Sequence, residues 1–101
     1  MSESNFREIK FKKVITALCE YKGISEEKLI ELLSNKDSRY LLFLLLKRYK
    51  CVDFEMINKH LVLSSKKSIN YNLKKAEEKF FLNKEFREKY FEADEIIKNS
   101  I

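Results

Sequence analysis

The side chains best suited to chemistry stand together in one run of hydroxyl, amine, amide and phenol groups, from residue 64 to residue 75. The first ten residues of the helix expected from Lys66 onward carry four lysines and no acid. Lysines at the start of a helix oppose the positive end of its dipole, at a cost of about 0.3–1 kcal/mol. An anionic partner bound there would turn that cost into attraction. The pattern predicts a surface for nucleic acid, and a solvated lysine face is the plainer alternative.

A short apolar helix, a tight turn and this basic helix predict a helix-turn-helix at about residues 53–75, the element that enters a DNA major groove. Ile69, Leu73 and Ala76 recur at helical spacing and mark the buried face. This assignment places on the other side Lys66, Lys67, Asn70, Tyr71 and Lys74. We expect DNA contacts from Ser64, Ser65, Lys66, Lys67 and Ser68 at phosphates, from Asn70 and Tyr71 at bases, and from Lys74 at the flanking backbone. The alternatives are a half-buried packing role for Tyr71 and an ordinary surface amide at Asn70.

The remaining reactive side chains form no recognisable catalytic or metal site. Cys19 and Cys51 are the only cysteines and His60 is the only histidine, whereas a zinc site takes about four clustered ligands. Glu77 and Glu78 are adjacent, so their side chains diverge by about 100° on a helix. We therefore predict a non-catalytic protein without cofactor, metal or small-molecule substrate. Both cysteines are expected in the core, and His60 is expected to face solvent or to cap a helix.

Composition favours a small helical protein. The 101 residues include one glycine and no proline, and 45% of them are hydrophobic, which disfavours disorder and tight β-turns. The formal charge of +5 permits a polyanionic partner. Residues 1–13 show no secretory signal, and the apolar run from Tyr40 to Leu46 is far shorter than the roughly 20 residues that span a bilayer. We predict one cytoplasmic all-α domain over residues 1–101 that does not enter a membrane.

The elements that must position the basic helix follow from helical periodicity and from capping residues. The first helix is expected to start near Ser4 or Asn5 and to end at Gly23. The expected caps of the next three helices are Ser25, then Asp37 or Ser38, then Asp53. The third helix, about residues 39–49, is apolar on nearly every side and is therefore expected to be central. With the basic helix and a last helix at about residues 84–98, the sequence predicts a compact bundle of five to six helices.

The last helix differs from the basic helix in charge. Its expected buried face consists of Phe86, Tyr90, Ala93 and Ile97. Its exposed side is expected to be acidic, and so to face away from DNA, through Glu85, Glu88, Glu92, Asp94 and Glu95. Phe81 and Phe91 are surplus aromatic residues, which we expect to pack against this helix. They are also the residues from which a homodimer would be built.

In the order of these elements, the chain resembles the C-terminal DNA-binding domain of the bacterial replication initiator DnaA, a helical domain of the Trp-repressor-like class. The likeness covers roughly residues 8–80. The residues that carry it are the first helix and break at 12–25, Glu26-Glu27-Lys28-Leu29, the central helix at 39–49, Ile57-Asn58, Ile69 and Lys74-Lys75. The resemblance implies a stand-alone relative that binds double-stranded DNA through its helix-turn-helix.

Three segments depart from that family. Leu61-Val62-Leu63 stands where the family's turn is glycine-rich, and residues 64–68 replace its site-reading Arg-Asp-His-Ser/Thr-Thr. Residues 34–38 are shorter than the family's basic minor-groove loop and leave only Lys36 and Arg39. We expect the fold to transfer and the family's sequence specificity not to. Sequence-specific or general DNA binding is thus the leading prediction, and the alternative is a protein–protein interaction module that kept the fold and lost DNA binding.

Overall fold

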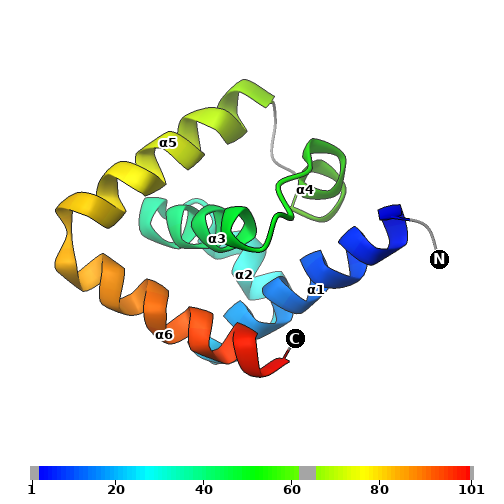
Figure 1. Ribbon diagram of the computed structural model, residues 1–101, viewed down its shortest axis with the longest axis horizontal. Coiled ribbons are helices and arrows are strands. Elements are labelled where there is room, and N and C mark those ends of the chain that lie inside the picture. The colour runs from blue at the N-terminus through cyan, green and yellow to red at the C-terminus, as the bar shows by residue number, and fades with distance from the viewer. Residues whose placement is uncertain (1–2, 62–65, 101) are drawn as a thin grey trace.

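The structure, a computed structural model, describes residues 3–61 and 66–100 of the chain. The described residues form six helices: α1 (Glu3–Lys22), α2 (Glu26–Leu32), α3 (Lys36–Arg48), α4 (Phe54–Leu61), α5 (Lys66–Leu82) and α6 (Lys84–Ser100). Figure 1 shows α3 in the middle of the molecule, with α5, α6, α1 and α4 around it. The predicted all-α bundle of five to six helices is confirmed for the described residues, which contain no strand. None of these helices is long and apolar enough to cross a bilayer.

α4 and α5 occupy the two helical parts of the predicted helix-turn-helix. The segment that joins them, residues 62–65, lies outside the described residues. The turn itself therefore stays a prediction, and so do the phosphate contacts expected from Ser64 and Ser65. α6 is longer than expected, because it continues to Ser100 rather than ending near residue 98.

Four of the helices begin with a side-chain oxygen that accepts a hydrogen bond from a backbone N–H three residues later. These oxygens belong to Ser25 before α2, Asn35 before α3, Asp53 before α4 and Asn83 before α6. The predictions for Ser25 and Asp53 are confirmed. The prediction of Asp37 or Ser38 as the cap of α3 is wrong, because the amide oxygen of Asn35 starts the helix about one turn earlier. The predicted end of α1 is confirmed at Gly23, whose φ is +67°.

The core forms around α3, as its apolar sequence predicts. The buried residues of this helix include Leu41, Leu42, Phe43, Leu45 and Leu46. The most extensive contacts between helices join α3 to α5 and α1 to α6. Cys19 and Cys51 are buried free thiols, as expected, and burial raises the pKa of both.

The prediction that Asp94 belongs to the exposed acidic side of α6 is wrong, because this residue is only 2% exposed. One carboxylate oxygen accepts hydrogen bonds from Arg48 Nε at 3.0 Å and from the Tyr49 hydroxyl at 2.5 Å. Lys98 Nζ lies 3.5 Å from the other carboxylate oxygen. A charge can be buried when it is both paired and hydrogen-bonded in this way. Asp94 therefore links α6 to the end of α3. The other acids predicted on the exposed side of α6 are exposed: Glu85, Glu88, Glu92 and Glu95.

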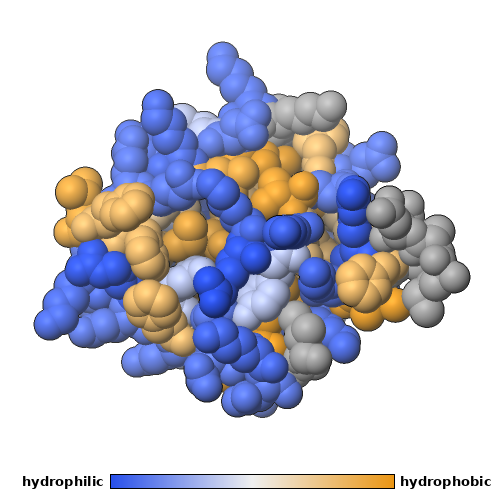
Figure 2. Space-filling model, in the orientation of Figure 1, coloured by the Kyte–Doolittle hydropathy of each residue, from blue (hydrophilic) through white to orange (hydrophobic). Residues whose placement is uncertain are grey.

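The expectation that Phe81 and Phe91 pack against the last helix is wrong. Phe81 is 76% exposed and Phe91 55%, and the neighbouring Leu82 is 86% exposed. The inner position between α5 and α6 is filled instead by Phe80 and Tyr90, whose ring centroids lie 5.2 Å apart. Figure 2 shows hydrophobic side chains gathered at the left edge of the molecule, where α5 ends and α6 begins. We call Phe81, Leu82 and Phe91 the corner patch.

Candidate nucleic-acid interface

The structure brings four of the predicted DNA-contacting residues together on one side of α5. Lys67, Asn70, Tyr71 and Lys74 are all exposed and follow one another at i, i+3, i+4 and i+7. Residues at this spacing share a helix face. We call these four residues the polar stripe. The alternative of a half-buried packing role for Tyr71 is contradicted, because its side chain is 58% exposed.

The opposite face of α5 holds the helix against α3. Ile69 and Ala76 are buried there, and Leu73 and Phe80 are partly buried against the same core, as their spacing predicts. Because a helix that packs along one stripe must present the other side to solvent, this packing explains why the polar stripe points outward.

A polar contact in the buried face of α5 fixes the helix further. Asn72 is buried, and its side-chain oxygen accepts a hydrogen bond from Arg39 Nε at 2.7 Å. The amide nitrogen of Asn72 donates to the backbone oxygen of Ser68, 2.7 Å away. The Asn72–Arg39 contact joins α5 to the start of α3. Asn72 is not among the predicted contacts, although an amide at i+3 from buried Ile69 needs a partner inside the protein, and that need is the signal that the sequence offers.

Arg39 is engaged inside the protein rather than reaching outward. Besides Asn72, its guanidinium donates to the backbone oxygens of Leu33 at 3.0 Å and Ser34 at 3.4 Å. It therefore joins the end of α2, the start of α3 and the middle of α5. Of the two basic residues Lys36 and Arg39 at the start of α3, only Lys36 is exposed.

The remaining predicted contacts do not lie on the polar stripe. Ser68 is half-buried, and its hydroxyl lies 3.4 Å from the Asn72 amide nitrogen that also bonds its backbone oxygen. It therefore lies beside the polar stripe, on the flank of α5 that turns toward α3. Lys66 is the first residue of α5, and its side chain is outside the described residues. The phosphate contacts expected from these two residues stay predictions.

The lysines of α5 divide into two groups by their partners. Lys75 lies 3.4 Å from a Glu78 carboxylate oxygen, and Lys79 forms an ion pair with Asp37. Lys67 and Lys74 make no ion pair with any residue that the structure describes. Their charges are therefore not neutralised locally and are available to an anion. Lys75 also lies over the ring of Tyr71, with its ammonium 5.7 Å from the ring centroid, which supports that side chain in its outward position.

The exposed surface of α6 carries the opposite charge. Glu85, Glu88, Glu92 and Glu95 are exposed. Glu92 accepts a hydrogen bond of 2.8 Å from the hydroxyl of Tyr21 on α1, and burial together with this contact raises the pKa of Tyr21 to about 12. An acidic face repels a polyanion, so the charges of α5 and α6 together favour approach from the side of the polar stripe.

His60 lies in a contact between α4 and α1, and the expectation of a solvent-facing or capping histidine is wrong. Its Nε2 is buried without a hydrogen-bond partner and lies 3.4 Å from a carboxylate oxygen of Glu8. Its ring is 5.5 Å from that of Phe11 and lines a pocket of about 200 Å³ between α1, α2 and α4. The nearby Lys59, with smaller effects from Lys12 and His60, lowers the pKa of Glu8. The ion pair between Lys59 and Glu8, with 3.6 Å between Nζ and a carboxylate oxygen, therefore joins α4 to α1.

The structure brings together few side chains that could hold a metal. Within residues 3–61 and 66–100, no three or more His, Cys, Asp or Glu side chains are grouped as metal ligands. The acids of α5 are instead engaged with lysines, because Glu77 pairs with Lys47 and Glu78 with Lys75. The polar stripe itself offers hydrogen bonding from Asn70 and Tyr71 and charge attraction from Lys67 and Lys74.

Comparisons of the chain with known protein families, with curated proteins and with solved structures find no significant match.

Proposed function

We propose that the protein binds double-stranded DNA through the polar stripe of α5, as a stand-alone relative of the DnaA C-terminal DNA-binding domain. In this proposal α4 and α5 act as the helix-turn-helix, and α5 enters the major groove. The observation that carries the proposal is the pair of exposed lysines without acidic partners, Lys67 and Lys74, which flank an amide and a phenol on the same face. That combination offers both phosphate and base contacts on one helix.

The spacing of the polar stripe supports a division of roles. Lys67 and Lys74 are seven residues apart, which is about 10.5 Å along a helix axis, so they can reach phosphates on either side of a short base sequence. Asn70 and Tyr71 lie between them. An asparagine can make two hydrogen bonds to adenine, and a tyrosine can contact a base or a phosphate. Ser64, Ser65, Lys66 and Ser68 are proposed to hold phosphates at the start of the helix.

Fluorescence anisotropy of a labelled mixed-sequence duplex across a salt series tests the proposal. The logarithm of the association constant should fall linearly with the logarithm of salt concentration, because bound lysines release counterions. In Lys67→Ala/Lys74→Ala the slope should become shallower by about two units, and affinity should fall for every sequence. The matched control is Lys13→Ala/Lys28→Ala, which removes two exposed lysines from α1 and α2 and should leave the slope within about half a unit of the parent.

Two results would contradict the proposal. If the Lys67/Lys74 variant and the control variant changed the slope equally, then DNA would not recognise the polar stripe in particular. If the parent protein failed to bind even at low salt, the protein-interaction alternative would replace DNA binding. The same lysines would then be tested with acidic proteins, because they attract any polyanion.

A further inference from the structure

The corner patch is a second surface, separate from the polar stripe, that the proposed DNA contact does not use. Its three residues are largely exposed, and two of them, Phe81 and Leu82, are consecutive. Phe81 and Phe91 flank the half-buried Phe80, with ring centroids 5.9 Å and 5.8 Å from it and steep interplanar angles. Phe81 and Phe91 therefore gather around Phe80, and Figure 2 shows hydrophobic side chains together at this corner of the molecule. Contiguous exposed apolar patches commonly mark interaction sites.

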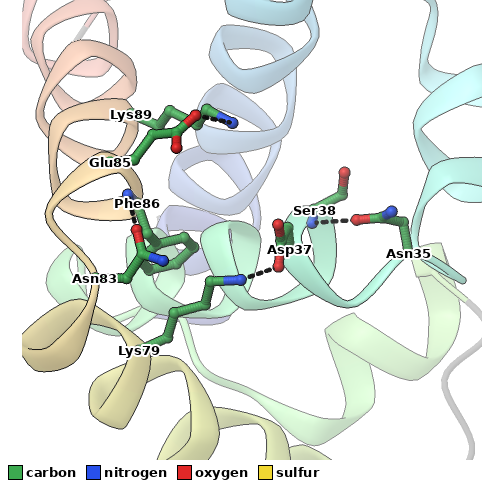
Figure 3. Close-up of polar contacts among 8 residues, drawn as sticks. All are labelled: Asn35, Asp37, Ser38, Lys79, Asn83, Glu85, Phe86 and Lys89. Atoms are coloured by element: carbon green, nitrogen blue, oxygen red, sulfur yellow. Dashed lines mark hydrogen bonds and ion pairs between the residues drawn. The ribbon is translucent and has the colours of Figure 1, made fainter.

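The corner patch sits on a part of the fold that several polar contacts hold in place. Arg87 Nη1 donates to the backbone oxygens of Phe80 at 2.8 Å and Phe81 at 2.9 Å, so it satisfies the last carbonyls of α5. Figure 3 shows Asn83 capping the next helix at Phe86, and Lys79 reaching across to Asp37 at the start of α3. A surface that is already fixed loses little conformational entropy when it binds.

The charged residues beside the patch favour a copy of the same surface. Lys84 and Glu88 share a face of α6 with Phe91, at i, i+4 and i+7. Neither makes an ion pair with another described residue, whereas the adjacent Glu85 and Lys89 approach to 3.8 Å. A surface with one positive and one negative group beside an apolar patch is complementary to a second copy of itself. A two-fold rotation brings Lys84 of each copy to Glu88 of the other. DNA or a strongly acidic protein would meet the like charge of Glu88.

We propose that the corner patch binds a second copy of this chain in a two-fold symmetric dimer. Phe81, Leu82 and Phe91 of the two copies form the apolar centre, and two Lys84–Glu88 pairs flank it. The exposed apolar area of the three residues is on the order of 400 Å² per copy, about half of what a stable interface buries on each side. The dimer is therefore weak and reversible, with a dissociation constant on the order of 100 µM.

Sedimentation velocity without DNA, over protein concentrations from about 10 to 500 µM, tests the proposal independently of the proposed function. The weight-average mass of the parent should rise from monomer toward dimer. In Phe81→Ser/Leu82→Ser it should stay at the monomer value. The matched control is Ile30→Ser/Val52→Ser, which makes the same kind of change at exposed apolar residues elsewhere and should leave self-association within a factor of two of the parent.

A charge exchange tests the orientation of the two copies. Lys84→Glu should weaken the dimer by about tenfold or more, because each of the two contacts would then place glutamate against glutamate. Lys84→Glu combined with Glu88→Lys should restore it, since the pairs are rebuilt with exchanged signs. A parent protein that stays monomeric at 500 µM would overturn the proposal, and so would a dimer that survives the double serine change. Because Lys84 and Glu88 are both exposed, the charge variants should fold, and circular dichroism checks the folding of each variant.

Discussion

The N-terminal half of α5 exposes Lys67, Asn70 and Lys74, whereas the C-terminal end of the same helix exposes Phe81 and Leu82. Both surfaces belong to one helix that packs along α3, yet they suit different partners. Charges without local neutralisation attract a polyanion over a distance that depends on salt. Apolar side chains lose water when they bind, and this gain depends little on ionic strength.

The two ends of α5 are also held by different contacts. The polar stripe is positioned from inside, through the buried contact of Asn72 with Arg39. The corner patch is held by contacts nearer the surface. Arg87 donates hydrogen bonds to carbonyls at the end of α5, and Lys79 forms an ion pair with Asp37. Each end of α5 thus has its own support, so each surface should be open to separate disruption.

The largest expected effect comes from reversing charge on the polar stripe. In Lys67→Glu/Lys74→Glu, repulsion replaces attraction at two phosphate contacts, and DNA affinity at low salt should fall by roughly 100-fold or more. Anisotropy measures this loss, and sedimentation should show unchanged self-association. Phe81→Ser/Leu82→Ser should abolish self-association and leave DNA affinity unchanged. The weak dimer is not populated at the low protein concentrations of the DNA titration, so its loss cannot affect that affinity. If both pairs of changes reduced both properties alike, the separation of the two surfaces would be wrong.

The next largest effect concerns the internal support of the polar stripe. Arg39→Ala leaves the buried oxygen of Asn72 without its donor, and the free energy of unfolding should fall by about 2 kcal/mol. Chemical denaturation measures the loss. In an Asn72→Leu background the same Arg39→Ala change should cost clearly less, because no buried oxygen is then left unpaired. Equal losses in the two backgrounds would show that the Asn72 contact contributes little.

Periodicity and capping chemistry predicted much of this fold. The apolar run in α3, the buried stripe of α6, and the ends at Gly23, Ser25 and Asp53 are local features that the chain carries within a few residues. The polar stripe was predictable in the same way, because Ile69 and Ala76 determine which side of α5 is buried. These features depend on spacing along one helix.

The features that the sequence did not reveal depend on which helices meet. Asp94 reads as one more surface acid until Arg48 and Tyr49 at the end of α3 are placed beside it. Asn72 reads as a surface amide until Arg39 reaches it from a position 33 residues away in the chain. Phe81 reads as a core residue until Phe80 and Tyr90 are seen to fill the space between α5 and α6. Helical spacing assigns a face, but only the neighbouring helix decides whether that face is covered.

A smaller effect is expected at the outer support of the corner patch. Arg87→Ala removes two hydrogen bonds to carbonyls at the end of α5, where water can partly replace them, so stability should fall by about 1 kcal/mol. Self-association should weaken several-fold because Phe81 is no longer held in place, while the salt slope of DNA binding should not change. Arg87→Lys keeps the charge but not the forked geometry, and it should restore only part of the loss. A change in the salt slope would place Arg87 in the DNA contact instead.

A further expected effect is a loss of stability at alkaline pH on the α6 side of the molecule. Burial, together with the hydrogen bond to Asp94, raises the pKa of Tyr49 from its ordinary value of 10.0 to about 12. At a pH well below 10 both the folded and the unfolded chain keep this proton, so the contribution of Tyr49 to stability is fully present. As the pH rises from about 10 to 12 the unfolded chain loses the proton first, and stability therefore falls over that interval. The Arg39–Asn72 contact that supports the polar stripe does not involve Tyr49, so it should persist.

Comparison with Tyr49→Phe isolates this effect from every other change that alkaline pH causes in the protein. The variant lacks the hydroxyl, so its stability should fall less than that of the parent when chemical denaturation is repeated at about pH 9 and about pH 11.5. Hydrogen exchange adds the location: in the parent, the residues of α6 near Asp94 should lose protection before those of α5 near Asn72. Equal pH dependence in parent and variant would mean that Tyr49 does not titrate differently in the folded chain. Loss of protection in α5 first would mean that its internal support is the weaker of the two, and that the polar stripe rather than the corner is the first surface to loosen.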